Sequence, residues 1–202
     1  MTPDEAAAVE RTVVELGTRA SWVVGAGSLP RGLGVDFYAR LVTALRDCDT
    51  RVCIDASGPP LAAAVDAGPD LIKPNFEELA ELVGRPLTRL ADVVDAASEI
   101  RKRGVGTVLV SLGGDGALLV SADEVLHGWA APVRVRSTVG AGDSTLAGFL
   151  AGGGTGRSAL VTAIAYGTAA VQLPGSVMPR PSDLAPDAVE ITDKPDLDRP
   201  LT

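Results

Sequence analysis

The sequence predicts an α/β fold, a doubly wound and mainly parallel sheet with helices on both faces. Short apolar runs alternate with helical stretches along most of the 202 residues, which is the pattern of repeated strand–helix units. Hydrophobic residues make up 46% of the chain and aromatic residues only 3%. A core of alanine, valine and leucine suits buried parallel strands with small-residue helices packed on them. The length fits one domain.

The expected elements of the first half follow one another in simple alternation. A helix is predicted over residues 4–16, because Thr2 can cap it and Pro3 suits its first turn. The pattern then predicts strands at 22–26, 51–55, 70–73 and 107–111, and helices at 36–45, 60–67, 76–83 and 90–103.

The second half is expected to begin with a hairpin of residues 117–120 and 125–129. Two alanine-rich helices follow, one ending at Leu150 and one over residues 158–172. The chain after residue 180 is rich in proline and aspartate with little periodicity. We therefore expect a main domain of residues 1–180 and a loosely ordered tail of residues 181–202.

Composition excludes several classes of function. Acidic residues outnumber basic ones by 26 to 18, giving a formal charge of -8, which argues against nucleic-acid and membrane-surface binding. His127 is the only histidine, so a zinc site with several histidines is excluded and a Ser-His-Asp triad is disfavoured. Cys48 and Cys53 are expected to be small hydrophobes in a reducing compartment. With no signal peptide or long apolar run, we expect a cytoplasmic protein.

The glycine-rich turn Thr138–Ser144 carries the strongest functional signal. It joins a strand-like run to a helix-like run, so backbone N–H groups at the helix start can hold an anion. Asp143 would repel a phosphate bound there, and this suggests another task, accepting a proton from an attacking hydroxyl. The structural alternative is that Asp143 only caps the helix. The motif alone leaves both interpretations open.

Three further turns follow predicted strands: Gly27–Gly32, Lys73–Glu78 and Ser111–Gly116. Ligands of such sheets bind at the carboxyl ends of strands, so we expect all four turns on one rim. Each also has a structural explanation: a rigid Pro/Gly turn, a capping box of Asn75 with Glu78, and a hairpin entry. The functional alternative is a phosphate site with a hydrated magnesium ion near Asn75 and Glu78.

Taken together, the turns resemble the PfkB-type sugar kinases of the ribokinase-like fold. The resemblance is greatest to the branch that phosphorylates sugar phosphates, which includes 1-phosphofructokinase, tagatose-6-phosphate kinase and the minor 6-phosphofructokinase. The matching segments are Gly27-Ser28-Leu29-Pro30-x-Gly32, Lys73-Pro74-Asn75-x-x-Glu78, Ser111-Leu112-Gly113, Ser137–Ser144 and Leu173-Pro174-Gly175. This resemblance implies ATP-dependent phosphoryl transfer to a ketohexose phosphate, with fructose 1-phosphate preferred and tagatose 6-phosphate or fructose 6-phosphate as the alternatives.

The resemblance also assigns roles to individual residues. Asp143 would be the catalytic base, beside an anion hole formed by the amides of Gly140, Ala141 and Gly142. ATP-binding positions would be Lys73, Asn75, Ser111, Gly113 and Gly116. The acceptor sugar phosphate would meet Gly27 and Ser28, and Glu78 would hold Mg²⁺ through water.

The chain resembles only part of the family. The first third of the family, which carries a lid and most sugar contacts, has no counterpart here, so the resemblance implies an N-terminally truncated core. A nucleotide-binding remnant without turnover is therefore the competing interpretation. Missing strands would leave an exposed sheet edge, which leads us to expect a homo-oligomer or pairing with another chain through that edge.

Overall fold

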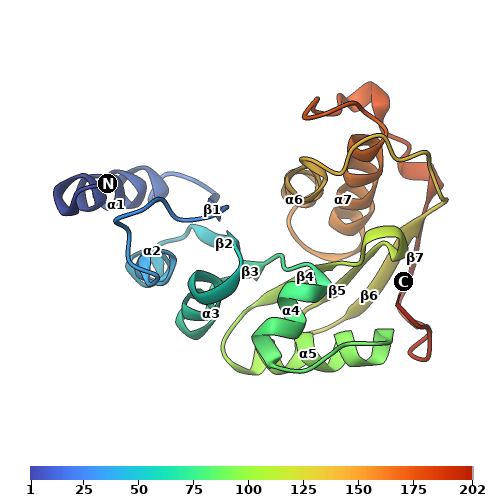
Figure 1. Ribbon diagram of the computed structural model, residues 1–202, viewed down its shortest axis with the longest axis horizontal. Helices are drawn as coiled ribbons and strands as arrows, with labels where there is room; N and C mark the ends of the chain where they lie inside the picture. Colours follow the sequence, from blue (N-terminus) through green and yellow to red (C-terminus); the bar gives the residue numbers. More distant parts are fainter. Residues whose placement is uncertain (202) are drawn as a thin grey trace. The chain divides into compact units, whose positions relative to one another are not determined.

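The computed structural model describes residues 1–201. The chain divides into two compact units. The first unit comprises Met1–Leu87 and Asp95–Leu109, and the second comprises Thr88–Val94 and the chain from Val110 onward. Figure 1 labels the elements of both. Within the described residues, no helix is long and apolar enough to cross a membrane.

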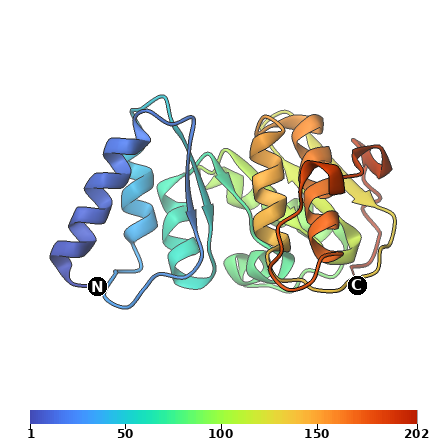
Figure 2. The same cartoon turned by 90° about the horizontal axis from the view of Figure 1, so that it is seen from above.

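The first unit is built from parallel strands that follow one another in the order of the sequence. Its elements are α1 Pro3–Gly17, β1 Trp22–Ala26, α2 Phe37–Leu45, β2 Arg51–Asp55, α3 Gly58–Ala67, β3 Leu71–Ile72, α4 Phe76–Val83, most of α5 Leu90–Lys102 and the start of β4 Thr107–Ser111. Right-handed crossovers between sequential strands place their helices on the same face. In agreement, α2 and α3 contact each other and both contact β2, and α1, α2 and α3 lie side by side (Figure 2).

Periodic apolar positions make these elements. The buried face of α2 consists of Phe37, Tyr38, Leu41, Val42 and Leu45, the spacing of one helical stripe. Strand β2 is buried over Val52, Cys53 and Ile54, as expected of a strand covered on both faces. Strand β3 is short because Pro74 follows Lys73 and lacks the N–H that would continue the ladder.

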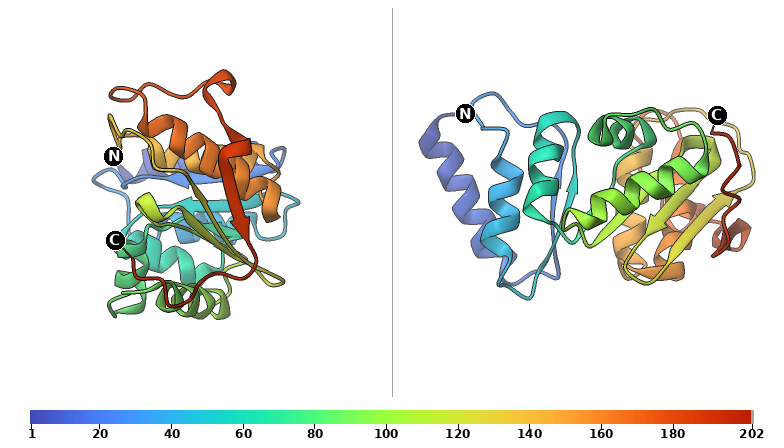
Figure 3. Two further views of the ribbon diagram at one scale, coloured as in Figure 1. Left: turned by 90° about the vertical axis from the view of Figure 1, so that its right-hand side faces the viewer. Right: turned by 90° about the horizontal axis from the view of Figure 1, so that it is seen from below.

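The second unit combines an antiparallel meander with two helices. Its elements are β5 Ala117–Val120, β6 Val125–Ala130, β7 Val189–Thr192, α6 Ala141–Ala151, α7 Gly156–Val171 and the 3₁₀ turns Gly113–Asp115, Pro181–Asp183 and Pro186–Ala188. Helix α7 packs on all three strands (Figure 3). Gly148 allows α6 to approach α7, because a Cβ there would lie 2.7 Å from the Thr162 carbonyl oxygen.

The α/β class is confirmed, and the strands predicted over 22–26, 51–55, 70–73, 107–111, 117–120 and 125–129 are present, but the strand-like run before the turn Thr138–Ser144 is irregular and not a strand. The pairing is more mixed than expected: β1 to β4 are parallel, whereas β5, β6 and β7 are antiparallel. The tail of residues 181–202 was expected to be loosely ordered, and its described part contains the strand β7 Val189–Thr192. Strand β7 pairs with β6 from Val189 to Thr192. The residues of β7 are partly or fully exposed, so the sequence shows no clear alternation of apolar and polar positions there. Backbone pairing with β6 defines this edge strand.

Candidate active site

Helix α6 begins without a side-chain cap. Gly140 stands at the N-cap in the left-handed region, with φ +76, a conformation that glycine adopts without strain. The Ser144 N–H donates to the Gly140 carbonyl oxygen at 2.9 Å. Within the described chain, the N–H groups of Gly142 and Asp143 meet no acceptor. Two open donors and the positive end of the helix dipole together favour an anion at this point.

Asp143 lies in the first turn of α6 with its side chain exposed. No hydrogen bond or ion pair holds its carboxylate among the residues that the structure describes. The carboxylate is therefore free to accept a proton from a bound molecule. The simple capping alternative does not occur, since the N-cap position belongs to Gly140 and its side chain has no oxygen.

Helix α4, in the first unit, begins in the opposite way. The Asn75 Oδ1 atom accepts a hydrogen bond from the Glu78 N–H at 2.8 Å, and Glu78 Oε2 accepts one from the Asn75 N–H at 2.9 Å. This reciprocal pair is a complete capping box. The structural alternative foreseen for this turn is thus realised, and one Glu78 oxygen still lies outside the box.

Lys73 is held by a buried ion pair. Its Nζ atom lies 3.1 Å from Asp55 Oδ2, and the two side chains are only 6% and 15% exposed. The register explains the contact: Ile54 of β2 pairs with Ile72 of β3, so the next residue on each strand reaches the same edge. Burial raises the pKa of the neighbouring Cys53 thiol, and the Asp55 charge acts in the same direction. Cys53 is therefore a neutral core residue, as expected.

The loop Ser111–Gly116 is open at one end and anchored at the other. A Cβ added to Gly113 or Gly114 would meet no atom within 4 Å. By contrast, a Cβ at Gly116 would collide with the backbone of Gly128 on β6, so Gly116 serves the approach of two strands. The Asp115 side chain is buried, and its Oδ1 atom lies 2.7 Å from Arg199 Nη2.

His127 also contacts this loop. Its Nε2 atom lies 2.9 Å from the Asp115 carbonyl oxygen, so Nε2 carries the proton and donates it. Burial lowers the pKa of His127, and the Arg199 cation acts in the same direction. His127 is thus a buried residue whose ring supports this loop.

The turn Gly27–Gly32 starts at the carboxyl end of β1. Gly27 has φ +82, and its N–H donates to the Asp55 carbonyl oxygen at 2.8 Å. The Tyr38 hydroxyl lies 3.0 Å from the Ala26 carbonyl oxygen and 2.9 Å from that of Gly27. These contacts fix the start of the turn, while Ser28 remains exposed.

The predicted site residues fall into two sets. The first unit carries Gly27, Ser28, Lys73, Asn75 and Glu78, and the second carries Ser111, Gly113, Gly116 and Gly140 to Asp143. Their meeting on one rim stays a prediction. Sequence reasoning missed Asp55, Asp115 and Arg199 as partners of these turns. Strand register could have indicated Asp55, but no local signal marks Arg199.

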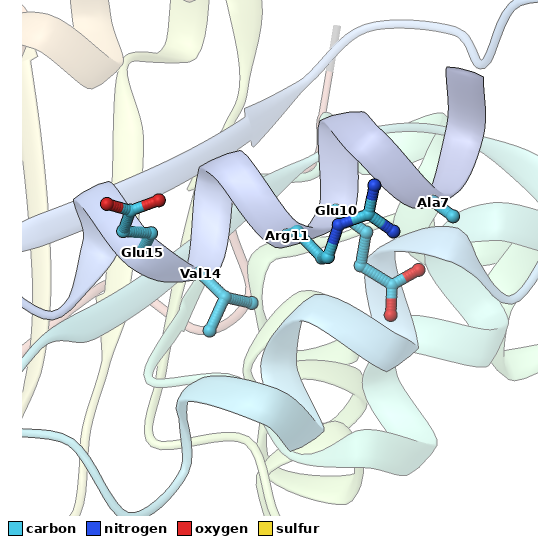
Figure 4. A pocket seen from close by; sticks show the side chains of 5 residues that line it. All are labelled: Ala7, Glu10, Arg11, Val14 and Glu15. Carbon is cyan, nitrogen blue, oxygen red and sulfur yellow. The ribbon is translucent and has the colours of Figure 1, made fainter. Parts of the chain in front are cut away.

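A hollow on α1 contains none of these residues. It is lined by Ala7, Glu10, Arg11, Val14 and Glu15, all from that one helix (Figure 4). Charged side chains on the surface of a single helix are the ordinary solvent-facing pattern. The hollow therefore offers no competing active site.

Comparison with known proteins decides the family. The pattern of the pfkB family carbohydrate kinases matches residues 3–182. The chain belongs to this family. All four turns described above, including the open start of α6, lie inside the matched range.

Individual relatives of this pfkB member are phosphofructokinases. The 1-phosphofructokinase of Rhodobacter capsulatus is 39% identical over 196 residues, covering 95% of this chain and 62% of the relative. The ATP-dependent 6-phosphofructokinase isozyme 2 of Escherichia coli is 40% identical over 146 residues, covering 71% and 47%. The chain thus spans about three-fifths or less of these relatives.

The fold of the pfkB member agrees with a solved relative. The Escherichia coli phosphofructokinase-2, crystallised in complex with substrates and products, superposes with a TM-score of 0.83 at 36% identity. The match covers 91% of this chain and 61% of that one. A ribokinase-like phosphofructokinase core is therefore the architecture to which the described elements correspond.

Proposed function

We propose that the protein transfers a phosphoryl group from ATP to a ketohexose phosphate, with fructose 1-phosphate as the preferred acceptor and fructose 1,6-bisphosphate as the product. The open start of α6, with Asp143 exposed beside unbonded amides, carries this proposal. Family membership supplies the class of reaction. Relatives named 1-phosphofructokinase supply the acceptor.

Asp143 acts as the general base. Its carboxylate takes the proton of the acceptor hydroxyl as the oxygen attacks the γ-phosphorus, the bond to the β-bridging oxygen breaks, and ADP leaves. A positioned base contributes about 10²–10⁴ in rate. The exposed position of Asp143 suits contact with a bound sugar.

The amides of Gly140, Ala141 and Gly142 form the proposed anion hole. Phosphoryl transfer spreads charge over the equatorial oxygens, so fixed donors and the dipole of α6 stabilise it without reorganising. The left-handed φ of Gly140 sets the direction of these amides. We expect the transferring group to lie against them.

Ser111, Gly113 and Gly116 are the proposed ATP-binding positions of the second unit, and Lys73 and Asn75 are those proposed for the first. The empty space beside Gly113 and Gly114 leaves room for a nucleotide to approach the backbone. The ion pair with Asp55 holds the Lys73 cation in a fixed position for the proposed contact with ATP, and Asp55 neutralises part of its charge. Gly116 contributes indirectly, by closing the loop onto β6.

Glu78 fits the role proposed for it toward Mg²⁺. The described residues hold no group of three or more metal-ligating side chains, and one Glu78 oxygen is engaged in the capping box. A single carboxylate acting through water agrees with the way Mg²⁺ keeps most of its hydration and binds phosphates. When bound, the ion would neutralise phosphate charge.

The acceptor phosphate is proposed to meet Gly27 and Ser28. Fructose 6-phosphate is the second candidate, favoured by the match to the 6-phosphofructokinase isozyme. Tagatose 6-phosphate remains the third. We also propose that the protein works in the cytoplasm, and that the edge strand β1 of the first unit pairs with another chain or another copy.

The test is Asp143→Asn in a chimaera that joins an N-terminal segment of the Rhodobacter capsulatus relative to this chain. Asparagine keeps the size but cannot accept the proton. Turnover should fall by about 10²–10⁴ while ATP affinity is equal or slightly tighter. Asp187→Asn, the same change on an exposed residue of another turn, is the matched control.

A turnover within a few-fold of the parent chimaera would remove Asp143 from the mechanism. No turnover in the parent, despite ATP binding and correct folding, would support the nucleotide-binding remnant instead. Initial rates with fructose 1-phosphate and fructose 6-phosphate in parallel decide between the two leading acceptors.

A further inference from the structure

The last described residues dock on the start of α5, and this contact is unexpected from the sequence. The Leu90 N–H donates to the Arg199 carbonyl oxygen at 2.9 Å, and the Ala91 N–H donates to that of Leu197 at 3.0 Å. The Leu201 N–H donates to the Thr88 carbonyl oxygen at 3.1 Å. The first-turn amides of α5 are thus satisfied by backbone oxygens of the segment 197–201, which we name the C-terminal clasp.

An exposed ion pair also joins the C-terminal clasp to the residue before α5. Arg89 Nη1 lies 3.2 Å from Asp198 Oδ1, but the Asp198 side chain is 90% exposed. Such a pair contributes little to stability. It is useful here as a reference, because it belongs to the same clasp and does not touch the loop Ser111–Gly116.

Arg199 extends from the C-terminal clasp to that loop. Its Nη2 atom lies 2.7 Å from Asp115 Oδ1, in a pair whose side chains are 36% and 8% exposed. Removing one partner of a buried ion pair is destabilising, because the remaining charge loses a favourable contact. The carbonyl oxygen of Asp115 accepts the hydrogen bond from His127 Nε2. Asp115 is therefore held through its side chain and through its backbone.

The anchored residue lies next to the open part of the loop. Gly113 and Gly114 face empty space, and Gly113 has φ +59. As glycines, they have no side-chain contacts that could hold the loop in place. The Asp115 N–H donates to the Leu112 carbonyl oxygen at 3.0 Å, and the Gly116 N–H donates to that of Gly113 at 3.2 Å. Asp115 is therefore the anchored residue of the short turn that contains both glycines.

We propose that Arg199 is a positioning residue for the nucleotide loop, acting through Asp115 and thereby coupling the C-terminal clasp to ATP binding. This inference rests on the proposed function for the assignment of ATP to the loop. The Arg199 cation also offsets the charge of the Asp115 carboxylate beside this loop. Coupling is reciprocal, so ATP should in turn hold the clasp more firmly on α5.

The test uses the chain itself with Mg²⁺ and ATP, comparing Arg199→Gln with Arg89→Gln. Calorimetry measures ATP affinity, and amide hydrogen exchange measures order at Gly113–Gly116, Leu90 and Ala91. Arg199→Gln should weaken ATP by about tenfold and speed exchange in the loop even without nucleotide. Arg89→Gln should change the affinity less than about twofold, because surface pairs contribute little. In the parent, ATP should slow exchange at Leu90 and Ala91.

A double variant keeps the test valid if Arg199→Gln folds poorly. Asp115→Asn combined with Arg199→Gln removes the buried charge, so folding should recover while the loop stays unanchored, with faster loop exchange and weaker ATP affinity than in the parent. Unchanged affinity and exchange in Arg199→Gln, or an equal loss in Arg89→Gln, would overturn the proposal.

The two proposals fail in different ways. If the parent does not bind ATP but Arg199→Gln still loosens the loop, the positioning role stands and the ATP site is wrong. If the parent binds ATP and Arg199→Gln alters neither readout, the ATP site stands and the positioning role is wrong.

Discussion

The starts of helices α4 and α6 were both expected to be ligand turns, and they differ in how their amides are used. At α4, Asn75 and Glu78 bond each other's backbone N–H groups. At α6, glycine occupies the cap, and the amides of Gly142 and Asp143 have no acceptor in the described chain. One start is closed by its own side chains and the other is open.

The difference separates a structural task from a catalytic one. A closed capping box stabilises its helix and leaves few donors for a ligand. An open start forgoes that stabilisation and keeps donors and dipole for an anion. We therefore expect Asn75 substitutions to change mainly stability, Glu78 substitutions to change magnesium dependence more than stability, and substitutions at the α6 start to change mainly phosphoryl transfer.

The largest stability effect should come from Lys73, just before the closed start. Lys73→Met removes the cation that pairs with the buried Asp55 carboxylate. Breaking a buried pair from one side costs about 3–5 kcal/mol. Urea denaturation measures the loss, with the exposed Lys102→Met as the matched control. A cost below about 1 kcal/mol, similar to that of an exposed pair, would show that Lys73 is not fixed by Asp55.

A smaller effect is expected in the capping box itself. Asn75→Ala removes one half of the box and should cost about 0.5–2 kcal/mol of unfolding free energy. Glu78→Gln should cost less, since glutamine at this position also bonds the cap residue, yet it should weaken the magnesium dependence of ATP binding. Paired urea and magnesium titrations check both. An unchanged magnesium titration in Glu78→Gln would show that the Glu78 carboxylate only caps α4 and does not act on Mg²⁺.

The smallest effect concerns pH and the anchored loop. Burial lowers the pKa of His127, with Arg199 assisting and Asp115 opposing. The unfolded chain takes up a proton near pH 6.5 and the folded chain resists it. Above pH 6.5 His127 does not lower the free energy of unfolding. Between pH 6.5 and the lowered pKa of the folded state, that free energy falls as the pH decreases, by at most about 1.4 kcal/mol per pH unit.

His127→Gln keeps a hydrogen-bond donor but does not titrate. Its unfolding free energy should therefore change less than that of the parent between pH 7.5 and 5.5, as measured by urea denaturation. Parallel curves for parent and variant would mean that His127 is protonated equally in both states.

Local patterns predicted much of this molecule. The strands and helices follow from apolar spacing, and both the open and the closed helix start could be foreseen from a few adjacent residues. Contacts between distant segments were missed, since Asp115 and Arg199 are separated by 84 positions. The antiparallel β7 was also missed, because half-exposed residues at a sheet edge give no clear alternation.

The most direct measurement is an amide NMR titration of this chain with Mg²⁺ and ATP. The account predicts the largest shifts at the N–H groups of Gly142 and Asp143, where no internal acceptor competes with phosphate. The Glu78 N–H, bonded to Asn75 at 2.8 Å, should move much less. Shifts that appear elsewhere and leave Gly142 and Asp143 unchanged would contradict the assignment of the open helix start to the phosphoryl group.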